Sequence, residues 1–245
     1  MADPLNTGEL LLKAQKRTFT QILSLALMYI LIILLLAVFL FFLLFSYTPI
    51  SGQSMENSIF DKQSCLMMRR GYSFTRGDIV TLDISESDEP HIIIKRVVAT
   101  EGDRIIFMIS PTDRRYMDLY IMKSGENTFS PTDEPYIKER MEYRNIHELL
   151  TNYYPNLTSI DISEDYAAGS NEETLKNLIL SHSVLVPENE FYYLGDNRNV
   201  SLDSRKNGCG KLSQLTGKML TVVDPGTFAD KILKILFNVG DNAIA

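Results

Sequence analysis

The hydrophobic pattern of the chain is dominated by one long apolar run near the N-terminus. Residues 22–45 are 24 consecutive positions at which only Ser24 and Tyr29 carry a polar group. A helix of this length is about 36 Å long, enough to cross the roughly 30 Å hydrocarbon core of a bilayer with some tilt. A helix packed on a globular core would instead be amphipathic. We therefore predict a transmembrane helix over residues 22–46.

The flanks of this run predict how it is oriented. Three basic residues precede it, at Lys13, Lys16 and Arg17, and the next basic residue is Lys62. Because basic flanks stay in the cytoplasm, residues 1–21 are expected to be cytoplasmic, and residues 47–245 to form an extracytoplasmic domain. A cleavable signal peptide is the alternative, but its apolar core is only about 7–15 residues long and ends at an Ala-x-Ala-like site. The segment SYTPISGQS that follows the run contains no such site.

Beyond the run, the pattern is typical of short β-strands separated by turns. Stretches rich in β-branched residues are bounded by Gly, Asp, Ser and Pro. They predict strands at residues 64–70, 77–84, 91–100, 104–109, 183–187, 191–196 and 217–225. Residues 110–183 are polar and Tyr-rich, with little apolar periodicity, and are interpreted as an inserted subdomain. The predicted fold is a membrane-anchored, mainly β protein with one N-terminal helix.

Two further helices are expected within the extracytoplasmic part. Residues 172–180 (EETLKNLIL) fit a helix that Ser170 or Asn171 would cap. Residues 230–238 (DKILKILFN) fit a short amphipathic helix, which is too short to span a bilayer.

Composition narrows the classes of function. The chain has 24 Lys and Arg against 31 Asp and Glu, a net charge of −7, so it lacks the basic balance of a nucleic-acid binder. Its three histidines follow no metal-ligand spacing, and we expect no metal and no cofactor. The two cysteines, Cys65 and Cys209, would lie in an oxidising compartment. A disulfide between them and a pair of isolated thiols both remain open.

Two side chains in this pattern are candidates for chemistry. Ser54 lies in a Gly-containing turn shortly after the predicted span, where most serines merely cap turns. Lys95 interrupts a β-branched strand and shares a face with Ile93 and Val97. It is either an edge lysine that reaches solvent or a buried amine whose pKa is lowered by desolvation. A pKa of about 8 would leave about a tenth of the amine neutral at pH 7, able to deprotonate a serine hydroxyl.

A third segment, LGDNRNVSLDSR at residues 194–205, is dense in ionic and small polar residues. On its own it fits a solvated turn. If it lies beside Ser54 and Lys95, Ser201 is placed to position the lysine, and Asp203 with Arg205 to lock the loop.

Taken in order, these segments resemble the signature boxes of bacterial type I signal peptidases. SGQSM resembles the nucleophile box, RGDIV at residues 76–80 the next strand box, KRVVATEGD at residues 95–103 the lysine box and GDNRNVSLDSR the last box. The boxes occur in the family's order, after an N-terminal anchor. The resemblance covers residues 50–103 and 191–218, about a third of the chain.

The resemblance implies a serine endopeptidase in the cell membrane that removes signal peptides from secretory precursors after an Ala-x-Ala sequence. The bilayer and these precursors are its expected partners. Ser54 would be the nucleophile, with its backbone N–H donating to the oxyanion, and Lys95 would be the general base. Ser201 would orient the lysine. Two ion pairs would brace the site, Asp203 with Arg205 and Asp196 with Arg96. The side chains expected to line the substrate pockets are Ile50, Met55, Ile59, Ile94 and Leu202.

The chain departs from the family pattern at three points. Asn57 stands where the family usually has proline, which puts the rigidity of the nucleophile turn in question. Thr100 and Glu101 replace a Leu-Pro pair before Gly102, and Gly52 lacks the hydroxyl that some members carry two residues before the nucleophile.

Three other functions compete with a general signal peptidase. A peptidase specialised for substrates such as pilins would carry much the same boxes. Self-cleaving transcriptional repressors share the Ser/Lys chemistry, but a membrane span replaces their DNA-binding helices here. A non-catalytic, membrane-anchored binding module would leave Lys95 as a mere edge charge.

Overall fold

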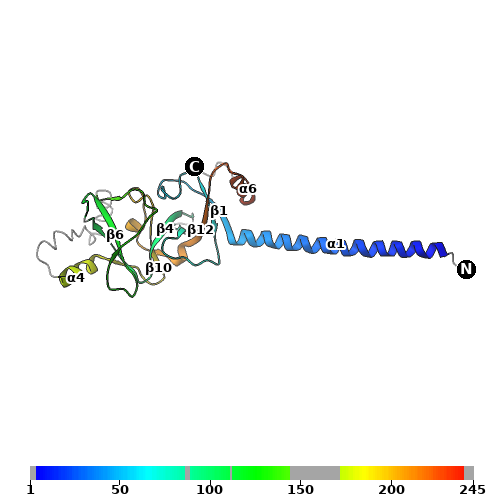
Figure 1. Cartoon of the computed structure of the whole chain (residues 1–245), viewed down its shortest axis with the longest axis horizontal. Coiled ribbons are helices and arrows are strands. Elements are labelled where there is room, and N and C mark those ends of the chain that lie inside the picture. The colour runs from blue at the N-terminus through cyan, green and yellow to red at the C-terminus, as the bar shows by residue number, and fades with distance from the viewer. Residues whose placement is uncertain (1–3, 86–88, 111, 144–171, 240–245) are drawn as a thin grey trace. The chain divides into compact units, whose positions relative to one another are not determined.

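The computed structural model of the chain describes residues 4–85, 89–110, 112–143 and 172–239. The chain divides into two compact units, Met1–Phe45 and Ser46–Ala245 (Figure 1). The first unit is helical and the second is mainly β, as the sequence predicts.

The N-terminal unit consists of helix α1 (Pro4–Leu44), drawn in blue in Figure 1. Its segment Thr18–Leu44 has 27 residues, and the mean hydropathy reaches 3.3 within it, so the segment is long and apolar enough to cross a membrane. Its apolar side chains are exposed rather than buried in protein, and Ile33 for example is 66% exposed. This confirms the predicted apolar helix. It ends at Leu44 rather than at residue 46, because the chain turns into a strand at Phe45.

In the described part of the second unit, the larger sheet has seven strands. In spatial order they are β1 (Phe45–Pro49), β2 (Ser64–Met68), β12 (Leu215–Val223), β3 (Ile79–Asp83), β4 (Ile92–Thr100), β10 (Glu190–Leu194) and β11 (Gly210–Lys211). Strand β4 is central to the site described below. It pairs antiparallel with β3 along Ile92–Arg96, and with β10 only from Arg96 onwards.

The smaller sheet continues directly from β4. Its strands are β7 (Ser130–Pro131), β6 (Tyr116–Met122), β5 (Arg104–Ile109) and β9 (Val184–Leu185) in spatial order, with β8 (Met141–Glu142) also paired to β6. The turn between β4 and β5 is held by Asp103, whose carboxylate accepts from the backbone of Thr100 and Ser124 and from the Arg76 guanidinium.

One apolar cluster joins the two sheets. It combines Val98 of β4 and Leu194 of β10 with Phe107 of β5 and Leu119 of β6, all less than 5% exposed. Burial of such side chains stabilises a fold by about 1.5–3 kcal/mol each. The smaller sheet is therefore packed on the strands that carry the site residues.

Four short helices complete the described chain. They are α4 (Glu172–His182), α5 (Ser204–Asn207), the 3₁₀ helix η1 (Leu212–Gln214) and α6 (Phe228–Phe237). Both predicted helices are present. Helix α4 covers all of the predicted residues 172–180, and α6 covers the predicted residues 230–238 except the last, which is its C-cap. The cap predicted for α4 lies outside the described residues.

All seven predicted strands are present, although most are shorter than their apolar runs. The low apolar periodicity of residues 110–183 did not reveal β6, which lies in this segment. Its side chains alternate, with Met117, Leu119 and Ile121 buried against the core. The sequence also missed β1 and the two-residue strands β7, β8 and β11. These short strands are set by their pairing partners more than by their own composition.

The two cysteines are free thiols in the described structure. Cys65 is packed in the cluster with Met55 and Ile59, whereas Cys209 packs against the cluster that joins the sheets. Burial raises the pKa of each thiol to about 12, so both are poor nucleophiles at neutral pH.

Candidate functional site

Ser54 is presented by a loop that leaves β1 and returns to β2. The base of the loop is closed where Ile50 N donates to Gln63 O at 2.9 Å. Near its tip, Gly52 N donates to Asp61 Oδ1 at 3.0 Å. The loop has left-handed backbone at Gly52 (φ 97°) and at Asn57 (φ 100°). Proline cannot adopt the conformation of Asn57, since its ring holds φ near −65°. The turn is thus built differently from one that contains the usual proline.

Lys95 projects from β4 directly onto this serine. Its Nζ lies 2.7 Å from Ser54 Oγ and the residue is only 4% exposed. Desolvation by burial lowers the pKa of Lys95 from its ordinary 10.5 to about 8, with Asp203 opposing and Arg205 assisting the change. About a tenth of the amine is then neutral at pH 7. The edge-lysine interpretation is excluded by this burial.

The loop at residues 195–205 packs against the backbone of the nucleophile. Asn197 N donates to the Ser54 carbonyl at 3.1 Å. A Cβ added at Gly195 would lie 2.4 Å from that carbonyl oxygen and 2.2 Å from Ser201 Oγ. Non-bonded atoms do not come this close, so only glycine at position 195 allows the loop to pack against the Ser54 carbonyl. The sequence pattern did not indicate this role for Gly195.

The loop is locked internally by the predicted pair of Asp203 and Arg205. Both residues are fully buried, and the guanidinium donates through Nε and Nη2 to the two carboxylate oxygens at 2.8 Å each. The carboxylate also accepts from Gly195 N at 3.0 Å. Burial alone would raise the pKa of Asp203, but Arg205 and these hydrogen bonds hold it below its ordinary value. The carboxylate is therefore ionised at neutral pH.

The second predicted pair, Asp196 with Arg96, connects several segments. Nε and Nη2 of Arg96 donate to the Asp196 carboxylate at 2.8 and 2.6 Å. Nη1 donates to the Gly77 carbonyl at 2.6 Å, and Nη2 also to Ser58 Oγ at 3.0 Å. The guanidinium carbon lies 3.8 Å from the centre of the Tyr136 ring. The Arg96 side chain thus connects the nucleophile loop with the start of β3 and with the 195–205 loop. It also contacts Tyr136, in the segment between β7 and β8.

Sequence reasoning missed a third ion pair beside the site. The Arg198 side chain is 1% exposed and donates to both carboxylate oxygens of Glu134, at 2.7 and 2.5 Å. Its Nε also donates to the Gly195 carbonyl at 3.1 Å. Glu134 comes from the segment interpreted as an insertion, 64 residues away in the chain, and no local pattern marks it. This segment therefore contacts the candidate site through Glu134 and Tyr136.

Ser201 lies inside the site, but no hydrogen bond joins it to Lys95 in the described structure. Its Oγ is buried and has no partner of hydrogen-bond geometry among the described residues. It is close enough to the Asp203 carboxylate to help lower the pKa of that acid. Its predicted orientation of Lys95 stays a prediction.

A cleft of about 260 Å³ opens in front of the two reactive atoms. It is lined by residues 48–51 and 91–95 together with Ser54 and Thr81. Ile50 and Ile94 face it, as expected for pocket residues. Met55 and Ile59 are completely buried in the cluster behind Ile50 and form its support. Leu202 lies outside the cleft and is 55% exposed, because its loop turns Ser201 inward and the next side chain outward.

Two backbone edges flank this cleft. Strand β1 is the first strand of the larger sheet, so one of its edges is unpaired among the described strands. Residues 92–95 of β4 pair with β3 on one side and extend beyond the end of β10 on the other. Such edges are suited to binding a peptide in an extended conformation.

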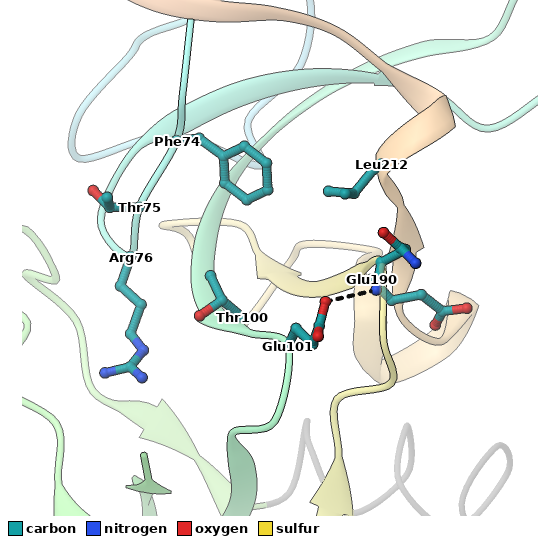
Figure 2. Close-up of a pocket in the computed structure, with 8 residues that line it drawn as sticks. Phe74, Thr75, Arg76, Thr100, Glu101, Glu190 and Leu212 are labelled. Carbon is teal, nitrogen blue, oxygen red and sulfur yellow. Dashed lines mark hydrogen bonds between the residues drawn. The ribbon is translucent and has the colours of Figure 1, made fainter. Parts of the chain in front are cut away.

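A larger hollow of about 500 Å³ lies elsewhere on the domain (Figure 2). Phe74 and Leu212 face each other across it, and Glu101 accepts a hydrogen bond from Asn189 N at 2.9 Å. None of the predicted site residues lines it. The smaller cleft, with its hydroxyl and amine in contact, is therefore the candidate active site.

The chain is similar to known proteins over most of its length. The family model described as signal peptidase, peptidase S26, matches residues 23–223. The chain is similar to signal peptidase IB of Staphylococcus aureus, with 25% identity over 183 residues, 73% of this chain and 76% of that protein. It is 26% identical to signal peptidase I of Streptococcus pneumoniae over 195 residues, 78% of this chain and 87% of that protein.

Among solved structures, the chain matches a signal peptidase I from Enterococcus faecalis V583. The TM-score is 0.33 at 21% identity, covering 61% of this chain and 98% of that one.

Proposed function

Since the chain belongs to the signal peptidase family, peptidase S26, we propose that Ser54 and Lys95 are the catalytic dyad of a peptidase that cuts after Ala-x-Ala. Membership of the family makes the chain a serine peptidase that removes signal peptides. The observation that carries the proposal is the 2.7 Å contact between Ser54 Oγ and the buried Lys95 amine. A hydroxyl in contact with an amine whose pKa is near neutrality is the arrangement that nucleophilic catalysis needs.

The reaction begins with the neutral fraction of Lys95. Its amine takes the proton of Ser54 as Oγ attacks the scissile carbonyl. The Ser54 backbone N–H donates no hydrogen bond within the described residues, so it is available to the oxyanion. The Lys95 ammonium then gives its proton to the departing amine, and the precursor's N-terminal segment stays as an acyl ester on Ser54. Water, deprotonated by Lys95, hydrolyses this ester and restores the enzyme.

The ion pairs around the dyad hold its geometry rather than take part in proton transfer. Asp203 with Arg205 supports the loop behind Lys95, and Asp196 with Arg96 supports the nucleophile loop through Ser58. Ser201 is proposed to orient the Lys95 amine when substrate is bound. Such preorganisation matters because misplacement of a reactive group by about 1 Å can cost about a hundredfold in rate.

The cleft supports the preference for small side chains. A precursor segment would bind as a strand between the edges at residues 48–51 and 92–95. Alternate side chains of that strand would point into the cleft, where Ile50 and Ile94 leave a space of only about 260 Å³ for several residues. Alanine at alternate positions fits such a space, whereas larger side chains would collide with the fully buried Met55 and Ile59 behind it.

The anchor is proposed to bring enzyme and substrate to the same surface. We place residues 1–21 in the cytoplasm and the catalytic unit outside, because the basic residues precede the span. Ser54 follows Phe45 by nine residues, at most about 30 Å of extended chain. The nucleophile therefore remains near the bilayer surface from which a secretory precursor emerges.

The proposal is tested by cleavage of a membrane-inserted precursor by the full chain in proteoliposomes. Wild type should give one cut after Ala-x-Ala, identified by mass spectrometry of the product's N-terminus. Ser54→Ala should lower the rate by about 10³-fold or more, since loss of the nucleophile removes the covalent route. Ser213→Ala, an exposed serine in η1, is the matched control and should cleave normally. Cleavage by Ser54→Ala at the normal rate would exclude the dyad.

A further inference from the structure

Helix α6 presents an apolar face to the outside of the domain. The helix is well defined, with Thr227 as its N-cap and Asn238 as a left-handed C-cap. Four large side chains are exposed on it, Phe228 (79%), Ile232 (40%), Ile235 (80%) and Leu236 (46%). Their spacing of four, seven and eight residues places them on one side of a helix.

The opposite side of α6 attaches the helix to β1. Asp230 is 2% exposed and accepts a hydrogen bond from the Tyr47 hydroxyl at 2.5 Å. The Phe237 ring stacks on the Tyr47 ring with 6.3 Å between centroids. Lys234 forms an ion pair with Asp230 at 3.2 Å. The helix therefore docks through its polar and aromatic side, and its four large aliphatic and aromatic side chains on the other side stay exposed. Figure 1 shows α6 beside β1.

This attachment point is close to the place where the chain leaves the membrane. Tyr47 follows Leu44, the last residue of the apolar segment, by only three residues. Three residues of extended chain span at most about 11 Å. If α1 crosses the bilayer, the strand that holds α6 must begin at the bilayer surface.

We propose that α6 lies in the lipid–water interface, with Phe228, Ile232, Ile235 and Leu236 inserted among the lipid chains. Short helices with one strongly apolar face bind membranes in this way, parallel to the surface. Lys231, exposed beside the apolar face, is placed to reach the phosphate groups of the lipids. The catalytic unit then has two membrane contacts instead of one. This inference rests on the span of α1 and not on the chemistry of Ser54 and Lys95.

Lipid fits this face better than a second protein does. A stable protein interface usually buries about 800 Å² on each partner, whereas α6 offers four side chains on ten residues. A bilayer needs no complementary shape, and continuity with the membrane exit brings it to the helix.

A second contact limits the orientations of the catalytic unit. A domain held only by the segment after Leu44 would pivot about that point. Insertion of α6 fixes the angle of β1, which lines the cleft at residues 48 and 49. The effect is confined to substrates held in the same bilayer, because a soluble peptide reaches the cleft in any orientation.

The insertion is tested with a single tryptophan, since the natural chain has none. Full-length Ile235→Trp is reconstituted in vesicles of phosphatidylcholine and phosphatidylglycerol, with and without brominated acyl chains. We expect blue-shifted emission that the brominated lipids quench. Leu185→Trp is the matched control, at a 49% exposed leucine on β9 in the smaller sheet, and should give unshifted and unquenched emission.

Two results would overturn the proposal. Emission of Ile235→Trp like that of Leu185→Trp would mean that the face stays in water. A blue shift without quenching, or one that grows with protein density in the vesicles, would mean that protein covers the face.

A kinetic measurement complements the fluorescence. Ile235→Glu should slow cleavage of a membrane-inserted precursor and leave cleavage of a soluble peptide unchanged. Equal slowing of both substrates would contradict the proposed role in orientation. If wild type cleaves neither substrate, the proposed function fails, while lipid quenching of Ile235→Trp still decides the inference.

Discussion

Replacement of Lys95 by methionine is expected to abolish cleavage and, at the same time, to stabilise the folded catalytic unit. Methionine has nearly the length of lysine and no charge, so it fits the same apolar surroundings. The charged lysine destabilises the folded state, because the residue is only 4% exposed and its hydrogen-bond partner among the described residues is the neutral Ser54 hydroxyl. Active sites commonly sacrifice stability for function in this manner.

The magnitude follows from the pKa of Lys95. Its fall from 10.5 to about 8, at about 1.4 kcal/mol per pKa unit, corresponds to about 3 kcal/mol of destabilisation of the charged form. Loss of the hydrogen bond to Ser54 offsets about 1 kcal/mol of the gain. We therefore expect Lys95→Met to raise the free energy of unfolding by about 2 kcal/mol at pH 7.

The advantage of the variant depends on pH in a defined direction. Below about pH 8 the lysine is charged in both the folded and the unfolded state, and the folded wild type bears the full cost. Between about pH 8 and 10.5 the folded state binds fewer protons than the unfolded state, so the stability of the wild type rises with pH. The difference between wild type and Lys95→Met should therefore shrink across this interval.

The assay is urea unfolding of the full-length protein in detergent micelles at pH 7 and pH 10. The near-ultraviolet circular dichroism of tyrosine reports on the β unit, since the chain has 12 tyrosines and no tryptophan. Lys123→Met, at an exposed turn residue, is the matched control and should change stability by less than about 0.5 kcal/mol. Two results would contradict the proposal that the Lys95 amine is destabilised by desolvation. One is a Lys95→Met protein that is less stable than wild type at pH 7. The other is a stability difference between variant and wild type that is the same at pH 7 and pH 10.

Three further predictions concern residues that hold the site. Asn57→Pro, which restores the family's usual residue, should destabilise the unit by about 1–3 kcal/mol because φ of 100° is closed to proline; an unchanged urea midpoint would contradict this backbone. Gly195→Ala should cost about 1–3 kcal/mol and most of the cleavage activity, since its Cβ meets the Ser54 carbonyl at 2.4 Å; normal activity would show that the loop is not in contact. Glu134→Gln should cost about 3 kcal/mol by leaving the buried Arg198 guanidinium without its carboxylate, with a lower kcat/KM; unchanged unfolding and kinetics would remove Glu134 from the site's support.

The sequence alone predicted the parts of the site that depend on local patterns. Ser54, Lys95 and the 195–205 loop stand out by residue type and order, and β4 could be placed from its β-branched run. The lowered pKa of Lys95 was one of two interpretations that its β-branched neighbours left open, the other being an edge lysine that reaches solvent. The burial of Lys95 beside Ser54 decides between them.

The parts that depend on contacts between distant segments could not be predicted. Glu134 and Tyr136 reach Arg198 and Arg96 only after the smaller sheet has packed on β4 and β10. Their segment has no pattern that marks this role. The outward orientation of the Leu202 side chain likewise depends on the backbone conformation of its loop. The alternation of side chains along a strand does not apply there, because Leu202 is not in a strand.

The backbone conformation of Asn57 could not be predicted from the sequence either. Its substitution for proline suggested a less rigid turn, whereas the structure has a turn of different backbone, with left-handed φ at this position. Asparagine tolerates that region better than most residues, so the change of residue and the change of turn go together.

The activation of Ser54 by a neutral Lys95 is tested most directly by the pH dependence of kcat/KM for precursor cleavage between pH 5 and 10. This ratio reports on ionisations of the free enzyme, which is the state of the structure. Because the neutral amine is the base, kcat/KM should rise with a single ionisation near pH 8, tenfold per pH unit below it, and level off above it. A profile that is flat across this range, or one that falls as pH rises towards 8, would contradict the dyad.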